Sequence, residues 1–380
     1  MKNIPLFKVY MSDNACCSAV EVLKSGYIGQ GAKVDEFEEN LRNYFSNTFV
    51  STVNSATSGL TLAIHLLKDP SFDWPGLQEG DEVLCTPLTC TATNWPVLAN
   101  NLNIKWVDID PTNLNMDLND LARKITPRTK IILPVHWGGN PINLNKLKRI
   151  QEKAKDIVGF KPIIIEDAAH AMGSTFNGKR IGGHGNISVF SFQAIKHVTS
   201  VDGGAICFSN PSIYKRSRLL RWYGIDRDDS LRTDFRCESD ITEYGFKFHM
   251  NDVCASIGIE NLKDADRIVS SHQDNARYYQ DNLKDISGVQ LLDYNVNDSA
   301  SWIYTIKVYD RDNFMKAMKD RGIICSRVHE RNDKHTCVKQ FKSILPSLDE
   351  ISKSMICIPN GWWVTTEDRE YIKDCIIKGW

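Results

Sequence analysis

Two residues of this chain have the types and setting that covalent chemistry on an aldehyde needs. Lys196 is the one lysine of the mostly uncharged run SFQAIKHVTSVDGG, residues 191–204, and Asp167 ends the apolar run of IIIEDAAHAMG. A buried amine loses its proton because desolvation disfavours its charged form, and the neutral amine is a nucleophile. Pyridoxal 5'-phosphate is an aldehyde cofactor that requires such a lysine and an acid facing its ring nitrogen. The pair therefore indicates a pyridoxal-phosphate site.

A third segment supplies what the phosphate of that cofactor requires. VNSATSGLTLAIHL, residues 53–66, reads as a strand end, a turn of small residues and a helix. The backbone N–H groups of Ala56, Thr57 and Ser58 are then expected at a helix N-terminus, which favours anions. Simple N-capping of that helix by Ser55 or Thr57 is the alternative. Ser191 is a further candidate phosphate donor, because it lies close before Lys196 in the sequence.

These residues must be positioned by an alternation of strands and helices. Short apolar runs alternate with helix-length amphipathic segments such as 56–69 and 141–157, which is typical of a parallel sheet covered on both faces. The expected strands are NTFVSTV, DEVLCTP, IKWVDID, KIILPVHW, KPIIIEDAA, ISVFSF and GGAICFS. The carboxyl ends of neighbouring strands meet at one edge of such a sheet, so Asp167 and Lys196 can share one cleft.

The order of elements changes after about residue 260. WIYTIKVYD, DNFMKAMKDRG and IICSRV read as strand, helix and strand, and TTEDREYIKDCIIKG reads as a closing helix. We therefore expect a large α/β domain over residues 1–260 and a small C-terminal α/β domain over residues 261–380.

Composition and charge exclude several classes of partner. The chain has 380 residues, of which 42% are hydrophobic, and its formal net charge is −1. This balance favours neither nucleic acid nor an anionic membrane, and no apolar run is long enough for a membrane span. Eleven cysteines without regular spacing, and a start without the pattern of a signal peptide, favour the cytoplasm. A zinc site is not expected, because no CxxC pair with metal-ligand spacing occurs.

The sequence resembles the DegT/StrS family of pyridoxal-phosphate sugar aminotransferases, within the fold-type I aminotransferase superfamily. SGYIGQGAKVDEFEENL, NSATSGL, GDEVLCTPLTCTAT, VDIDPTNLNMD, ITPRTKIILPVHWGG, IEDAAHAMG and SFQAIKHVTSVDGG follow one another in family order. The resemblance implies a three-layer α/β fold and a homodimer with shared active sites. It also implies that Lys196 forms the internal aldimine, that Asp167 pairs with the pyridinium nitrogen, that His170 lies beside the ring oxygen and that Ser191 binds the phosphate.

Two positions depart from the family pattern. LTCTAT places Cys90 where many members have an aromatic residue stacked on the cofactor ring, so Trp95 or Trp137 is a candidate to compensate. In YGFKFHMND, Lys247 stands where the family often has an asparagine that reaches the phosphate of the neighbouring subunit's cofactor. A lysine there suits a dianion, and a solvated surface lysine is the alternative.

The segment VHERNDKH is similar to a family stretch with two histidines near the sugar. A site with His329, Arg331 and His335 would suit a hydroxyl-rich ligand that bears a diphosphate, whereas histidines of the core or surface are the alternative.

The leading hypothesis is thus an aminotransferase that moves an amino group from L-glutamate onto a nucleotide-linked keto-deoxysugar, with a 4-keto-6-deoxyhexose favoured over a 3-keto sugar. A related branch of the family deoxygenates sugars with the same cofactor, but it has histidine in place of the lysine, and Lys196 disfavours it. His197 is adjacent to Lys196, so this branch stays an alternative. A regulatory protein on the same scaffold is a third hypothesis, and we would expect it to have lost Lys196 or Asp167.

Overall fold

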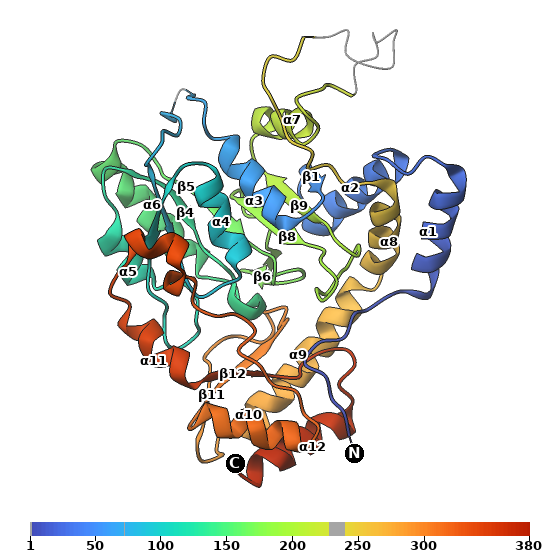
Figure 1. The fold of residues 1–380 in the computed structure, drawn as a ribbon, viewed down its shortest axis with the longest axis vertical. Coiled ribbons are helices and arrows are strands. Elements are labelled where there is room, and N and C mark those ends of the chain that lie inside the picture. The colour runs from blue at the N-terminus through green and yellow to red at the C-terminus, as the bar shows by residue number, and fades with distance from the viewer. Residues whose placement is uncertain (1, 72, 228–239) are drawn as a thin grey trace.

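The computed structural model of the chain describes residues 2–71, 73–227 and 240–380. Within these residues, a large sheet of seven strands has the order β1-β9-β8-β5-β4-β2-β3, and it lies in the upper part of the molecule in Figure 1. The strands are β1 Phe49–Val53, β2 Glu82–Cys85, β3 Asn103–Trp106, β4 Thr129–Leu133, β5 Ile163–Asp167, β8 Ile187–Ser191 and β9 Gly204–Phe208. All seven coincide with the strands that the sequence predicts.

The large sheet is parallel except at β9. From β8 through β5, β4 and β2 to β3 every pair of neighbours is parallel, whereas β9 runs antiparallel to both β8 and β1. The return of the chain from β8 to β9 is made by the segment that carries Lys196. The carboxyl ends of β5 and β8 therefore lie side by side, as the sequence predicts for Asp167 and Lys196.

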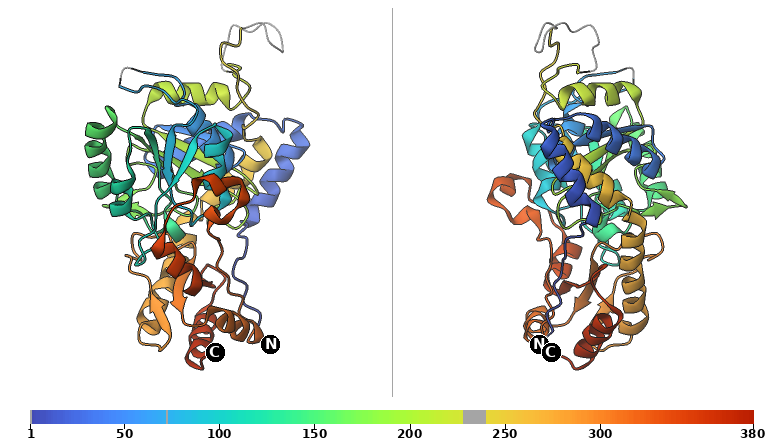
Figure 2. Two further views of the ribbon diagram at one scale, coloured as in Figure 1. Left: turned by 60° about the vertical axis from the view of Figure 1, so that its left-hand side comes forward. Right: turned by 90° about the vertical axis from the view of Figure 1, so that its right-hand side faces the viewer.

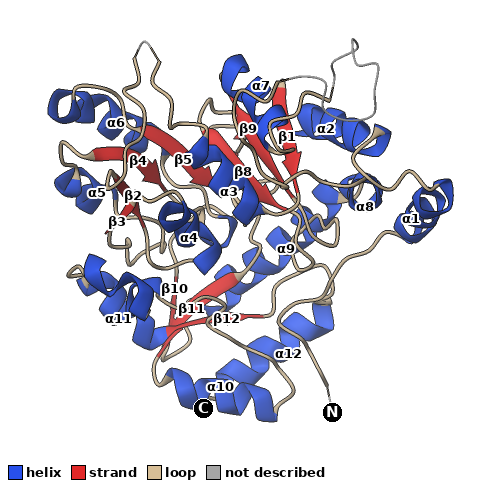
Figure 3. Ribbon diagram, turned by 45° about the horizontal axis from the view of Figure 1, so that its top comes forward, coloured by secondary structure: helices blue, strands red, loops and turns tan. Residues whose placement is uncertain are grey.

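Two separate cores cover the two faces of this sheet. On β4, Ile131 and Leu133 belong to one core and Ile132 belongs to the other, because successive residues of a strand point to opposite faces. α3 (Ala56–His65) and α4 (Thr91–Ala99) contribute to the first core, and α2 (Ala32–Phe45), α6 (Leu144–Val158) and α8 (Asp252–Leu262) contribute to the second. Figure 3 shows these helices on either side of the red strands. The three-layer α/β fold is confirmed.

A smaller antiparallel sheet forms the lower part of the molecule, with the order β10-β11-β12. Its strands pack in a third core together with α9, α10 and α12. The bounds are β10 Val289–Leu291, β11 Tyr304–Val308, β12 Met355–Ile358, α9 Ala265–Leu283, α10 Arg311–Asp320 and α12 Thr366–Ile377. The remaining elements are α1 Asp13–Ser25, α5 Leu118–Lys124, α7 Pro211–Leu220, α11 Pro346–Ser354, the hairpin β6 Thr175–Phe176 and β7 Lys179–Arg180, and the short 3-10 helices η1 Trp137–Gly139, η2 Asn332–Lys334 and η3 Thr336–Phe341.

One strand of the small domain was predicted wrongly. IICSRV, residues 323–328, makes only isolated bridges, from Ile323 to Ile4 and from Ser326 to Cys357. The segment ends in a turn, where Val328 has a left-handed φ of 64° and its N–H donates to Ser326 Oγ at 3.1 Å. The neighbours of β11 are instead β10 and β12, which the sequence analysis did not identify.

Contacts also cross the boundary that was predicted near residue 260. Ile4 pairs with Ile323 in the lower part of the molecule, and Leu88 pairs with Arg331 beside the large sheet. Figure 2 shows the N-terminal segment running down to the C-terminal helices. The division into residues 1–260 and 261–380 stays a prediction.

No helix in the described ranges has the length and apolarity that crossing a bilayer requires.

Candidate active site

Lys196 lies in a tight loop between β8 and β9. Its backbone N–H donates to Gln193 O at 2.9 Å, and the loop is closed where Phe192 N donates to Gly203 O at 2.9 Å. The side chain is partly buried, and its Nζ lies 3.5 Å from the ring centroid of Trp302. The loop thus directs one lysine inward, and it lies where the parallel strands end.

Burial changes the acid–base chemistry of this amine. Desolvation lowers the pKa of Lys196 to about 7, and the Asp167 carboxylate opposes part of that shift. A sizeable fraction of the amine is therefore neutral near pH 7. Such an amine can attack an aldehyde and can also accept or donate a proton.

Asp167 is the last residue of β5 and is paired in register with Val189 of β8. Its carboxylate is buried, and both of its oxygens accept hydrogen bonds. Thr93 Oγ1 donates to Oδ2 at 2.6 Å, and Ala169 N donates to Oδ1 at 3.0 Å. These donors fix the orientation of the acid. The sequence analysis did not identify Thr93, which reaches the site from α4.

The adjacent acid, Glu166, has a different role because it points to the other face of the sheet. It is fully buried, and its Oε2 lies 2.9 Å from His136 Nε2. Asn186 Nδ2 also donates to it, at 2.5 Å. Glu166 is thus held within the fold and leaves Asp167 as the acid at the strand end.

His170 lies within a group of aromatic rings. It stacks on Trp302 with ring centroids 4.1 Å apart, and its Nε2 lies 3.3 Å from His329 Nε2. Burial lowers the pKa values of both histidines, that of His329 to about 3, and the nearby Lys196 charge contributes. Both rings are therefore neutral at pH 7. His170 Nδ1 is buried and has no hydrogen-bond partner among the described residues.

The segment predicted to bind phosphate forms the start of α3. The Ser55 hydroxyl caps the helix by accepting from Ser58 N at 3.1 Å, as in the capping alternative. The first intrahelical bond runs from Gly59 N to Ser55 O, so the N–H groups of Ala56 and Thr57 precede it. These two groups, rather than that of Ser58, are the better candidates for a phosphate.

Gly204 explains how β9 approaches the start of α3 so closely. A Cβ atom at this position would lie 2.8 Å from Ala56 N and 2.7 Å from Phe190 O, which no side chain can accommodate without movement. Gly204 is paired in register with Ser191, which is buried at the end of β8. Ser191 is thereby placed near the start of α3.

Cys90, Trp95 and Trp137 are the residues considered for stacking on the cofactor ring. Cys90 is exposed at the N-cap of α4 and lies within electrostatic reach of Lys196. Trp95 is half-buried and packs edge-on against His335, while Trp137 is buried and packs edge-on against His170 and His329. The assignment of the stacking role stays a prediction.

Lys247 is exposed, but its backbone is tied to the phosphate segment of its own chain. Asn54 Nδ2 donates to Lys247 O at 3.2 Å, and Asn54 N donates to Phe248 O at 2.7 Å. The Lys247 Nζ lies 5.3 Å from the Trp222 ring centroid and 5.7 Å from that of Tyr223. The ammonium is thus presented to the outside of this chain.

Of the three residues considered for the substrate, only His329 directly contacts the residues around Lys196. Arg331 is engaged by two acids, because its Nε and Nη2 donate to Asp333 at 2.8 and 2.6 Å and its Nη1 donates to Asp349. These acids raise the pKa of its guanidinium. Arg331 is free for a diphosphate only if these ion pairs open.

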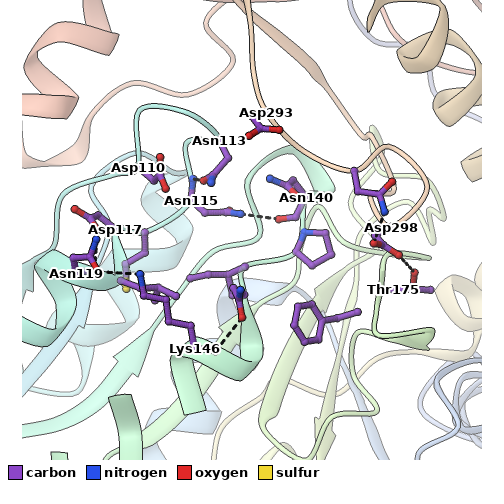
Figure 4. Close-up of a pocket in the computed structure, with 17 residues that line it drawn as sticks. Asp110, Asn113, Asn115, Asp117, Asn119, Asn140, Lys146, Thr175, Asp293 and Asp298 are labelled. Atoms are coloured by element: carbon purple, nitrogen blue, oxygen red, sulfur yellow. Dashed lines mark hydrogen bonds between the residues drawn. The ribbon is translucent and has the colours of Figure 1, made fainter. Parts of the chain in front are cut away.

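A pocket with a volume of about 380 Å³ lies elsewhere, and Figure 4 shows it. Carboxylates and amides dominate its wall, and the labelled side chains are Asp110, Asn113, Asn115, Asp117, Asn119, Asn140, Lys146, Thr175, Asp293 and Asp298. None of the predicted site residues is among the described residues that line it. The pocket is therefore separate from the surroundings of Lys196.

The described part of the chain contains no group of three or more histidine, cysteine, aspartate or glutamate residues placed to hold a metal.

The residues present fit pyridoxal phosphate. Lys196 is a partly neutral amine for the aldehyde, Asp167 is an oriented carboxylate for the ring nitrogen, and the unpartnered Nδ1 of His170 is a polar atom that needs a partner. The N–H groups of Ala56 and Thr57 precede the first intrahelical bond of α3 and are candidates to donate to an anion. Together these residues match a ligand that has an aldehyde, a basic ring nitrogen, a polar ring substituent and an anionic group.

The chain is similar to several proteins of known structure. The structure of AtS13 from Actinomadura melliaura is 44% identical and covers 100% of both chains, with a TM-score of 0.94. The sugar aminotransferase CalS13 from Micromonospora echinospora is 41% identical and covers 99% of this chain and 100% of its own, with a TM-score of 0.93. Spr1654 from Streptococcus pneumoniae, described as a putative sugar aminotransferase and solved in a PLP form, is 24% identical, covers 99% of this chain and 98% of its own, and shares the fold with a TM-score of 0.88.

The sequence model of the DegT/DnrJ/EryC1/StrS aminotransferase family matches residues 11–377. The match spans the phosphate segment, Asp167, Lys196 and the C-terminal helices, so it includes every part of the candidate site. The protein is thus a transaminase, and the chain belongs to the DegT/DnrJ/EryC1/StrS aminotransferase family.

Proposed function

We propose that the protein uses pyridoxal 5'-phosphate to move an amino group from L-glutamate onto the keto carbon of a nucleotide-linked 4-keto-6-deoxyhexose. The observation that carries the proposal is the partly buried Lys196, whose pKa of about 7 gives it both a nucleophilic and a proton-transferring form. The nearby oriented carboxylate of Asp167 supports it, as does the likeness to CalS13, a sugar aminotransferase.

Each residue of the site has a defined task in this proposal. Bound pyridoxal phosphate supplies an aldehyde that holds the amino nitrogen and a ring that takes up electrons released at the substrate carbon. Lys196 would hold the cofactor through its aldehyde and would carry protons at the substrate carbon. Asp167 would keep a proton on the ring nitrogen, and His170 Nδ1 would bind the ring oxygen. Ala56 N, Thr57 N and Ser191 Oγ would bind the phosphate.

The sugar substrate would lie beside His329, which links the C-terminal segment to His170. His335 and Arg331 follow on the same segment and are candidates for the hydroxyl groups and the diphosphate. The cytoplasm is the proposed location, because the sequence favours a reducing compartment.

We also propose a homodimer in which both chains complete each site. Lys247 is exposed, so a second copy can reach its ammonium, and its backbone is bonded to the phosphate segment at Asn54. Tyr27 is 85% exposed and Ile28 is 49% exposed beside an apolar groove, which is surface that a second copy can cover. In a two-fold dimer such an exchange is reciprocal and yields two equivalent sites.

The decisive experiment incubates the purified protein with L-glutamate and a panel of nucleotide-linked keto-sugars. We expect one sugar to gain an amino group, and NMR of the product then distinguishes amination at C4 from amination at C3. Loss of a hydroxyl group without a gain of nitrogen would identify a deoxygenase, and the absence of any turnover with intact cofactor binding would favour a regulatory protein.

The assignment of Lys196 has its own test. Borohydride reduction of the protein loaded with pyridoxal phosphate, followed by peptide mapping, should place the reduced cofactor on Lys196, and Lys196→Ala should abolish the label. A label on any other lysine contradicts the assignment.

A further inference from the structure

Trp302 contacts Lys196 closely and has no role in the chemistry described so far. Its indole is only 1% exposed, and the Lys196 Nζ lies 3.5 Å from the ring centroid. A cation within about 6 Å of an indole face is attracted by the negative face of the ring. The contact is therefore well inside the range of a cation–π interaction.

The indole is held firmly in this position. Its Nε1 donates to Ile195 O at 2.9 Å, which ties the ring to the residue next to Lys196. Phe7 stacks on it with ring centroids 5.2 Å apart, and His170 stacks on it at 4.1 Å. Because neighbours on three sides fix the ring, it can hold a mobile amine in a defined place.

Lys196 has no stronger partner available within the described parts of the chain. No carboxylate among these residues forms an ion pair with it, and Asp167 acts on it only through its field. Desolvation of an ammonium that has no ion-pair partner is unfavourable, so a lysine that alternates between a bonded and a released state needs a site for the released state. The face of Trp302 is the candidate site.

We propose that Trp302 is a positioning residue that holds the Lys196 ammonium against its indole face whenever the lysine is not bonded to the cofactor. This inference rests on the proposed function, because only a lysine that is released during turnover needs such a site. The indole favours the charged amine and so opposes the effect of burial. The released lysine then stays within reach of the substrate carbon as a proton donor.

The test measures the titration of Lys196 directly in the full-length protein after removal of bound cofactor. Competitive acetylation across a pH series, read by peptide mass spectrometry, gives the labelling midpoint of each lysine, and exposed lysines serve as internal references. We expect Trp302→Leu to lower the Lys196 midpoint by about one pH unit, because the charged form loses its aromatic partner. Trp302→Phe should give a smaller shift, because a benzene ring binds cations more weakly than an indole.

Two further variants separate this role from packing. Phe7→Leu loosens the same cluster without removing the indole face and should leave the midpoint unchanged. Site-specific replacement of Trp302 by fluorinated tryptophans keeps the shape of the side chain, and the midpoint should fall stepwise as fluorines are added.

An unchanged midpoint across the fluorinated series overturns the proposal, and so does an equal shift in Phe7→Leu. The measurement needs neither substrate nor cofactor, so it is independent of the borohydride experiment. If pyridoxal phosphate fails to attach to Lys196 while the midpoint still depends on Trp302, the proposed function is wrong and the contact is real.

Discussion

At the scale of single residues, the orientation of Asp167 depends on a hydroxyl group from another helix. Thr93 Oγ1 donates to Asp167 Oδ2 at 2.6 Å in a buried setting. We expect Thr93→Val, which keeps the shape and removes the donor, to lower the free energy of unfolding by about 1–3 kcal/mol. Urea unfolding measures this loss, and Thr93→Ser, which retains a hydroxyl, is the matched control. Equal stability of Thr93→Val and the wild type would show that Asp167 needs no such donor.

The residues that the sequence could identify are those whose role follows from their place on one element. Asp167 ends an apolar strand and Lys196 follows the next strand, so their common location could be predicted. Thr93 and Trp302 could not be found in this way, because they reach the site from α4 and from the segment before β11. Such contacts depend on how distant segments pack, which local patterns do not specify.

At the scale of elements, the approach of β9 to the start of α3 requires the absence of a side chain at Gly204. Gly204→Ala would place a Cβ atom 2.8 Å from Ala56 N. We expect the strain to lower stability by about 1–3 kcal/mol and to weaken the binding of pyridoxal phosphate, because the displaced backbone carries the proposed phosphate donors. Thermal unfolding and cofactor titration measure the two effects.

Gly29→Ala is the matched control for this element. No described atom of the chain lies within 4 Å of a Cβ at Gly29, so the substitution should leave the free energy of unfolding nearly unchanged. If Gly204→Ala binds the cofactor as tightly as the wild type does, the start of α3 is not the phosphate site.

The elements of the large sheet could be predicted because their apolar runs are long and buried on both faces, as Ile131 and Ile132 illustrate. The small sheet was harder to predict. β10 has only three residues, none of which is fully buried, and IICSRV has the composition of a strand but bends away at Val328. Its pairing partners, Ile4 and Cys357, lie far away in the sequence, so composition alone could not reveal that it forms only bridges.

At the scale of the whole molecule, the proposed dimer can be tested by complementation. Lys196→Ala should be inactive, and Lys247→Ala should bind pyridoxal phosphate about tenfold or more weakly, because a charge-assisted contact to the phosphate is lost. After reversible dissociation and mixing, a mixed dimer has one site with Lys196 from one chain and Lys247 from the other. We expect activity to return at that site, as a steady-state assay can show.

Lys247→Arg provides the control, because it retains the positive charge and should keep most of the affinity for the cofactor. A fully active monomer in sedimentation experiments, or an inactive Lys247→Ala that never complements Lys196→Ala, contradicts the shared site.

The pairing of the two ends of the described chain has a consequence for the order of events during synthesis. Lys2 Nζ lies 2.8 Å from Asp368 Oδ1, and Ile4 exchanges backbone hydrogen bonds with Gly322 and Ile324. Residues 2–4 leave the ribosome long before these partners have been translated. The N-terminal segment therefore stays unpaired while the large sheet folds, and nascent chains stalled before Gly322 should expose it to proteases that the finished protein resists.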